Sequence, residues 1–160
     1  MKILLVNNGT LPVYSYGGTE RVVWYLGKTL AKLGHNVNFL VDKSLGCEFA
    51  TIIERNPEVD LIDQITDDFD IVHFHYLPKN IGKLRVPYII TQHGNSSVDT
   101  TLDKNTVFVS KNHAKRHRAE AFVYNGLDWN DYGNPQLENK RLYFHFLGKA
   151  AWRVKNVKGA

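Results

Sequence analysis

The sequence predicts an α/β fold with a doubly wound, mostly parallel sheet, and two observations predict this class. Short apolar segments recur along the chain, joined by helical or short linking segments. Polar residues directly follow several of these apolar segments. Because ligands of such sheets gather at the carboxyl ends of the strands, polar residues in those positions are typical of this class.

The first apolar segment, residues 3–6, is expected to be a strand that leads into the longest helix. That helix is expected to begin at the glycine pair Gly17-Gly18, with Thr19 as its N-cap, and to end at Gly34 in a left-handed conformation. The apolar residues that recur at helical spacing are Val22, Val23, Leu26, Leu30 and Leu33. One face of this helix should therefore pack on a core.

The glycine pair lies at the N-terminus of this expected helix, where backbone N–H groups are unpaired and the helix dipole is positive. Glycines lack a Cβ atom, so a phosphate or a sugar can approach this backbone closely. The pair suits a tight turn without a ligand equally well. The G-x-G-x-x-G fingerprint is absent from this position, which argues against an ordinary NAD site.

The remaining segments continue the alternation. Strands are expected at residues 36–41, 59–62, 70–76, 87–91, 106–109 and 122–124, and a short helix at residues 48–55. Residues 1–127 are thus expected to form one domain. Residues 128–140 are polar and contain glycine and proline, which predicts a linker. Residues 141–147 resume strand character, so residues 141–160 are expected to begin a second, incomplete domain.

The composition restricts the cellular setting. The chain has 160 residues and a single cysteine, Cys47, which cannot form an internal disulfide and suits a reducing compartment. No apolar run reaches the ~18 residues of a membrane-spanning helix, and the first residues do not form a signal sequence. A cytoplasmic protein is expected. The net charge of +4 is compatible with phosphate-bearing ligands, anionic lipid or nucleic acid.

Candidate site residues follow the expected strands. They are Asn8 after the first strand, His73 and His75 on a later one, His93 after the next, and then Ser110 and Asn125. His73 and His75 lie two apart and share a strand face, but no third ligand stands at a diagnostic spacing, so no metal is expected. His93 lies in a Gln-His-Gly turn, where its imidazole could donate a hydrogen bond or carry a proton.

Residues 111–118, from Lys111 to Arg118, form the most basic run of the chain. No aromatic residues are interleaved with the charges, so nucleic acid is not expected as a partner. Two interpretations remain open. The run is either a solvated helix face, or a peripheral contact with acidic lipid head groups or a phosphorylated acceptor.

Six sequence blocks together resemble a known family. They are GGTER, FDIVHFH, TQHG, VFVSKNHAK, VYNGLD and FHFLGKAAW. In this order they resemble the N-terminal, acceptor-side half of a retaining family-4 glycosyltransferase of the GT-B fold. The resemblance covers essentially the whole chain and implies two Rossmann-like domains facing a cleft.

The resemblance also implies a reaction and roles for particular residues. A hexose would pass from a nucleoside diphosphate sugar to a sugar or lipid-linked acceptor, without a metal or other cofactor. His93 would contact the transferred sugar, and Gly17 and Gly18 would lie against the donor diphosphate or the acceptor. Lys149 stands where the family has an arginine, and it would bind the diphosphate together with a second lysine. That second lysine is either Lys158 or Lys155.

The family's paired glutamates belong to a second domain that this chain lacks, so the chain alone is expected to be inactive. The alternative is a non-catalytic Rossmann-like module that binds a glycan or a phosphorylated metabolite, or that docks a partner. A reading frame that continues after Ala160 with paired glutamates would favour the enzyme, and a stop codon would favour the module.

Overall fold

The computed structural model describes residues 1–97, 99–140, 142, 148 and 155–159. It divides the chain into two compact units, Met1–Asp128 and Trp129–Ala160. No helix among the described residues is both long enough and apolar enough to cross a membrane.

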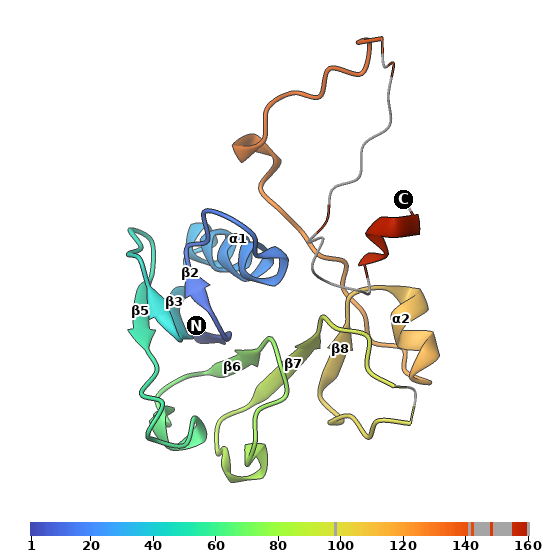
Figure 1. Ribbon diagram of the computed structural model, residues 1–160. Helices are drawn as coiled ribbons and strands as arrows, with labels where there is room; N and C mark the ends of the chain where they lie inside the picture. The colour runs from blue at the N-terminus through green and yellow to red at the C-terminus, as the bar shows by residue number, and fades with distance from the viewer. Residues whose placement is uncertain (98, 141, 143–147, 149–154, 160) are drawn as a thin grey trace. The chain divides into compact units, whose positions relative to one another are not determined.

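Among the described residues, the first unit contains a six-stranded sheet in the order β5-β3-β1-β6-β7-β8 (Figure 1). The strands are β1 (Lys2–Val6), β3 (Asn36–Val41), β5 (Thr51–Glu54), β6 (Ile71–Phe74), β7 (Tyr88–Gln92) and β8 (Thr106–Phe108). All neighbouring strands pair in parallel. The strand order reverses between β1 and β6, which makes that edge the topological switch point. The predicted Rossmann-like, doubly wound α/β class is confirmed.

Helix α1 (Gly18–Lys32) covers one face of the sheet (Figure 1). Val23 is fully buried, and a Cβ atom on Gly27 would lie 2.3 Å from the Phe39 ring, so Gly27 lets the helix approach the sheet closely. The helix ends as predicted at Gly34, which has a φ of +86°. The N–H groups of Gly34 and His35 bond the carbonyls of Ala31 and Leu30, a Schellman cap.

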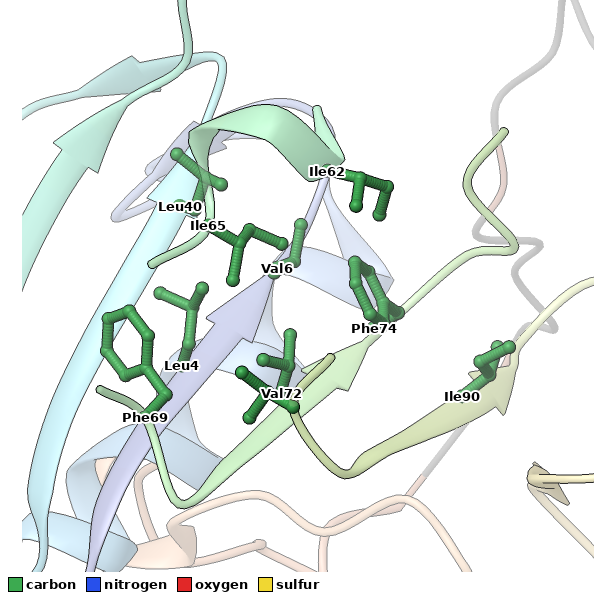
Figure 2. Close-up of a cluster of buried hydrophobic side chains, with 10 residues drawn as sticks. Leu4, Val6, Leu40, Ile62, Ile65, Phe69, Val72, Phe74 and Ile90 are labelled. Carbon is green, nitrogen blue, oxygen red and sulfur yellow. The ribbon is translucent and has the colours of Figure 1, made fainter. Parts of the chain in front are cut away.

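The opposite face of the sheet is covered by irregular segments instead of long helices. Figure 2 shows Leu4 and Val6 of β1 and Val72 of β6 pointing toward Ile62 and Ile65. The covering segments contain two single-turn helices, η1 (Ile62–Gln64) and η2 (Ile81–Lys83). Because successive side chains of a strand point to opposite faces, one apolar strand such as β1 supplies both cores.

Two predicted elements are wrong. The segment 48–55 was expected to be helical, but its β-branched residues Thr51, Ile52 and Ile53 form edge strand β5 beside β3. The segment 59–62 was expected to be a strand, but it is a turn. The Asp60 carboxylate accepts a hydrogen bond from the Ile62 N–H at 2.9 Å, and η1 follows.

Smaller corrections concern the ends of elements. Gly17, not Thr19, is the N-cap residue of α1, and no side chain caps this end. Leu33 was expected on the buried face, but it is 68% exposed because it follows the last helical residue. The expected strand at 122–124 is reduced to one parallel bridge between Phe108 and Phe122.

A short parallel pair, β2 (Thr10–Leu11) with β4 (Lys43–Ser44), follows β1 and β3. Helix α2 (Lys111–Arg116) follows β8. The described part of the second unit contains the single turns η3 (Trp129–Asp131) and η5 (Val157–Gly159). The strand expected at 141–147 falls almost entirely outside the described residues.

Candidate functional site

Three histidines meet at the carboxyl ends of β6 and β7, next to the switch point. His73 lies on β6, His75 directly follows it, and His93 directly follows β7. The parallel register of β6 with β7, in which His73 pairs with Ile89, brings these strand ends to the same edge. We call His73, His75 and His93 the edge histidines. The sequence predicted each of them as a site residue.

The edge histidines are linked by hydrogen bonds and stacking. His75 Nδ1 lies 2.9 Å from His93 Nε2, and His73 Nε2 lies 2.7 Å from Thr91 Oγ1. The rings of His73 and His75 stack with centroids 4.3 Å apart, and those of His75 and His93 are 5.2 Å apart. The rings therefore hold one another in fixed orientations.

Burial keeps this cluster neutral. It lowers the pKa of His73 to about 4, with a further contribution from His93, and it alone lowers the pKa of His93 to about 4. Burial also holds the pKa of His75 well below its usual value, helped by both neighbours. Neutral imidazoles donate or accept hydrogen bonds without adding charge. The site therefore offers polar contacts at neutral pH, not a cation.

His93 is the edge histidine best placed to meet a ligand. Its side chain is half-buried, whereas His75 is only 5% exposed. Nδ1 of His93 has no hydrogen-bond partner among the described residues. This atom is also not fully buried. It therefore keeps some exposure to solvent.

The glycine loop before α1 is held by the side chain of Arg21. The guanidinium donates to the carbonyl oxygens of Gly17 at 3.1 Å and Ser15 at 2.6 Å. These contacts fix the backbone of the loop at the end of the helix that carries its positive dipole. The arginine is thus a structural clamp for the loop that the sequence predicted as a ligand site.

The two glycines of the predicted site have different surroundings. A Cβ atom on Gly17 would lie 2.7 Å from Val13 Cγ2 and 2.9 Å from a Glu20 carboxylate oxygen. A Cβ atom on Gly18 would meet nothing within 4 Å. Gly17 is required by the protein's own packing, while the open side of the helix end is at Gly18.

The residues after β1 and β3 form a second polar group at the same edge. Asn7 is buried, and its amide donates to the carbonyl oxygen of Asn8 at 2.7 Å, while the side chain of Asn8 is exposed. Asp42 accepts a hydrogen bond from the Gly9 N–H at 2.8 Å and pairs with Arg55 at 2.8 Å. Asn8 thus remains accessible in the predicted position.

The other predicted residues are less closely tied to this edge. The Ser110 hydroxyl caps α2 by accepting a hydrogen bond from the His113 N–H at 3.1 Å. Asn125 is exposed beyond the bridge at Phe122. Lys158 is exposed in the second unit, and Lys149 lies outside the described residues.

Sequence reasoning missed three residues that shape the site. They are Thr91, which bonds His73, Glu20, which lies against the glycine loop, and Asp42, which holds Gly9. A threonine inside an apolar strand and an acidic residue in the first turn of a helix gave only weak signals. Among the described residues, no three histidine, cysteine or carboxylate side chains are grouped to hold a metal ion.

Comparisons with known proteins give a family for the chain and a solved structure with a similar fold. The chain matches the model of the family described as Glycosyltransferase Family 4 over residues 16–130. A solved structure similar to it is AviGT4, a glycosyltransferase involved in avilamycin A biosynthesis, with a TM-score of 0.66 and 22% sequence identity. That match covers 82% of this chain but 44% of AviGT4, so the chain spans less than half of that protein's length. No curated protein sequence matches the chain.

Proposed function

The chain belongs to glycosyltransferase family 4, and on that premise we propose that it forms the acceptor side of a retaining glycosyltransferase. The enzyme transfers a hexose from a nucleoside diphosphate sugar to an acceptor hydroxyl, without a metal. One observation carries this proposal. A neutral, half-buried His93 stands beside the switch point with one ring nitrogen open to a ligand.

His93 contacts the transferred sugar in this proposal. A glycosyl group carries several hydroxyl oxygens and no charge of its own, and a neutral imidazole can donate a hydrogen bond to one of these oxygens. The pKa of about 4 keeps His93 in this form throughout the neutral range.

The donor diphosphate is the anionic part of the reaction. Transfer places growing negative charge on this leaving group, which fixed N–H groups and cations stabilise. Gly18 is the open position at the N-terminus of α1, and Lys149 and Lys158 supply the cations of the proposal. The Glu20 carboxylate lies against Gly17, so an anion approaches the helix end from the side of Gly18.

A pocket beside the glycine loop suits the acceptor. It has a volume of about 240 Å³ and is lined by Pro12, Val13, Tyr14, Arg21, Trp24 and Tyr25. Aromatic rings and a few polar groups are the usual lining of pockets that hold small organic ligands. The mixed lining fits a sugar or a lipid-linked sugar, which has apolar C–H faces and polar hydroxyl edges.

The proposal requires a second domain to hold the donor. Fixing two reactants in reactive geometry can contribute ~7–11 kcal/mol to catalysis. A single wall of a cleft cannot do this, so residues 1–160 alone should bind donor weakly and transfer no sugar. The enzyme acts in the cytoplasm in this proposal, with residues 111–118 as a peripheral contact with anionic membrane lipid.

A transfer assay tests the proposal. The enzyme that contains this chain should consume one of a panel of nucleoside diphosphate hexoses, should remain active in EDTA, and should give a product with the anomeric configuration of the donor. Inversion of that configuration would overturn the retaining mechanism, and loss of activity in EDTA would overturn metal independence. Glycan binding with no transfer from any donor would favour a non-catalytic binding module.

The glycine pair provides a matched test of the ligand site. Gly18→Ala places a methyl group in open space, so the melting temperature should hold while the KM for donor rises. Gly17→Ala forces Val13 and Glu20 to move and should cost about 1–3 kcal/mol of stability. Unchanged donor KM in Gly18→Ala would remove the helix end from the donor site.

A further inference from the structure

The hydrogen bond between His75 and His93 joins two neutral imidazoles. One of the two nitrogens therefore carries the proton and donates the hydrogen bond, and the other accepts it. The two nitrogens are His75 Nδ1 and His93 Nε2, 2.9 Å apart. If His93 is the donor, His75 must carry its own proton on Nε2. If His75 is the donor, His75 Nε2 is bare and His93 carries its proton on Nδ1.

The surroundings of His75 Nε2 distinguish these two cases. This atom is buried and has no hydrogen-bond partner among the described residues. His73 stacks on the His75 ring, but its own Nε2 is committed to Thr91 Oγ1. Among backbone groups, a buried N–H without an acceptor is rarer than a buried carbonyl without a donor, and we apply the same preference to the imidazole nitrogens. A bare Nε2 on His75 is therefore the arrangement that leaves no buried N–H group unpaired.

We propose that His75 is a positioning residue: it donates its Nδ1–H to His93 Nε2 and so holds His93 in the tautomer that presents an Nδ1–H donor to the ligand. The Nε2–H tautomer is the more abundant form of a free histidine side chain in water. The contact with His75 thus imposes the less common form. His93 then serves as a hydrogen-bond donor to an oxygen of the ligand and cannot accept a proton at Nδ1.

The consequence for catalysis rests on the proposed function, whereas the tautomer does not. In a sugar transferase, an Nδ1–H donor fixed toward the transferred sugar orients a hydroxyl or ring oxygen without supplying charge. His75, buried behind His93 and 5% exposed, touches no ligand and acts only through His93. The arrangement resembles the way in which a partner on one ring nitrogen sets the chemistry of the other.

Nuclear magnetic resonance of the ¹⁵N-labelled chain at neutral pH reads the tautomer directly, because protonated and bare ring nitrogens have well-separated shifts. We expect His93 to show a protonated Nδ1 and a bare Nε2. A protonated Nε2 on His93 would overturn the proposal. This measurement needs neither substrate nor a second domain.

Two substitutions at one position test whether His75 imposes the tautomer. His75→Asn keeps an N–H donor near the position of Nδ1, and His75→Phe keeps the ring volume but has no donor. We expect His93 to keep its Nδ1–H form in His75→Asn and to shift toward Nε2–H in His75→Phe. An unchanged His93 spectrum in a folded His75→Phe variant would overturn the role of His75. If that variant fails to fold, the wild-type spectrum still decides the tautomer.

Transfer assays of the intact enzyme separate this inference from the proposed function. We expect kcat in His75→Phe to fall about 10- to 100-fold, by analogy with groups that orient a ligand through another residue, with a smaller change in the KM for donor. His75→Asn should recover most of that loss. A switched tautomer with an unchanged kcat would remove His93 from the chemistry and leave the tautomer assignment standing.

Discussion

Two groups of histidines occupy buried positions of the first unit, and their surroundings differ. Among the edge histidines, His75 is hydrogen-bonded to His93, and His73 is hydrogen-bonded to Thr91. The α2 histidines, His113 and His117, instead pack on the ring of Phe108, with centroids 4.9 Å and 5.1 Å away. Nε2 of both α2 histidines is buried and has no partner among the described residues.

The difference shows that histidines at a suggestive spacing along the chain can have quite different surroundings. His113 and His117 are four apart on a helical segment, a spacing that often holds a metal, yet their rings meet edge to face at 5.5 Å against an apolar neighbour. His73 and His75 lie two apart on a strand and gain their importance from His93, which is 18 residues further along. The hydrogen bonds and the strand end define the site.

The largest expected effect is the pH dependence of stability. The edge histidines bind protons more weakly in the native state than in the unfolded chain, where the pKa is about 6.5. Stability should therefore be complete above about pH 6.5 and should fall as the pH drops toward about 4, because the unfolded chain takes up protons first. A shift of this size at His73 corresponds to about 3 kcal/mol, and the more exposed His93 adds less.

Urea denaturation at pH 7 and pH 4.5 measures this loss, and histidine C–H resonances assign it to individual rings. The edge histidines should remain neutral down to about pH 4 to 5. Equal stability at the two pH values, or edge resonances that titrate near pH 6.5, would contradict a neutral buried cluster.

The two groups of histidines should also differ in their effect on turnover, which is the next largest effect. His93→Ala in the intact glycosyltransferase should lower turnover by about 10²-fold or more, the effect of losing a group that stabilises the reacting centre. His117→Ala is the matched control, because His117 is also half-buried but packs on Phe108. Turnover of His93→Ala within about threefold of the wild type, at an unchanged melting temperature, would remove His93 from the site.

Much of the fold could be predicted from the sequence because the strongest signals are local. The apolar strands β1, β3 and β6 and the amphipathic α1 have buried faces that periodicity reveals. The failures lie in short segments at the border of the sheet. Strand β5 is mostly exposed, so it lacks an apolar pattern, and the pairing with β3 that creates it is a tertiary contact.

The grouping of the candidate histidines at one sheet edge could be predicted, but their contacts could not. Histidines after strands pointed to the edge at β6 and β7, and the fold brings them together. The bond between His75 and His93 joins two strands that are separate in the sequence, so no local pattern contains it. Glu20 and Asp42 were missed for the same reason, since each acts on a loop glycine through space.

The two groups of histidines should also differ in the stability that is lost when one member is replaced by phenylalanine. His73→Phe leaves Thr91 Oγ1 without its partner and should cost about 1–2 kcal/mol. His113→Phe removes a buried nitrogen that has no partner among the described residues and keeps the ring against Phe108, so it should be neutral or slightly stabilising. Urea denaturation at pH 7 measures both. A larger loss in His113→Phe than in His73→Phe would reverse the distinction between the two groups.

The smallest expected effect concerns the outer surface of α2, whose buried side carries His113. Lys111 and Lys115 are exposed, while His113 and Ala114 are buried, so the basic side chains face away from the core. If this surface contacts anionic lipid, Lys115→Gln should weaken binding to vesicles rich in phosphatidylserine by about 1 kcal/mol, or about fivefold. Sedimentation with the vesicles at low and physiological salt measures the change.

The control variant is Lys79→Gln, which removes the same charge from an exposed position outside α2. A contact through α2 should be weakened by Lys115→Gln and much less by Lys79→Gln, because attraction to a lipid surface decays within a Debye length. Equal weakening by the two variants would mean that the net charge alone attracts the protein to the vesicle. Binding that neither variant nor added salt changes would leave α2 as a solvated face.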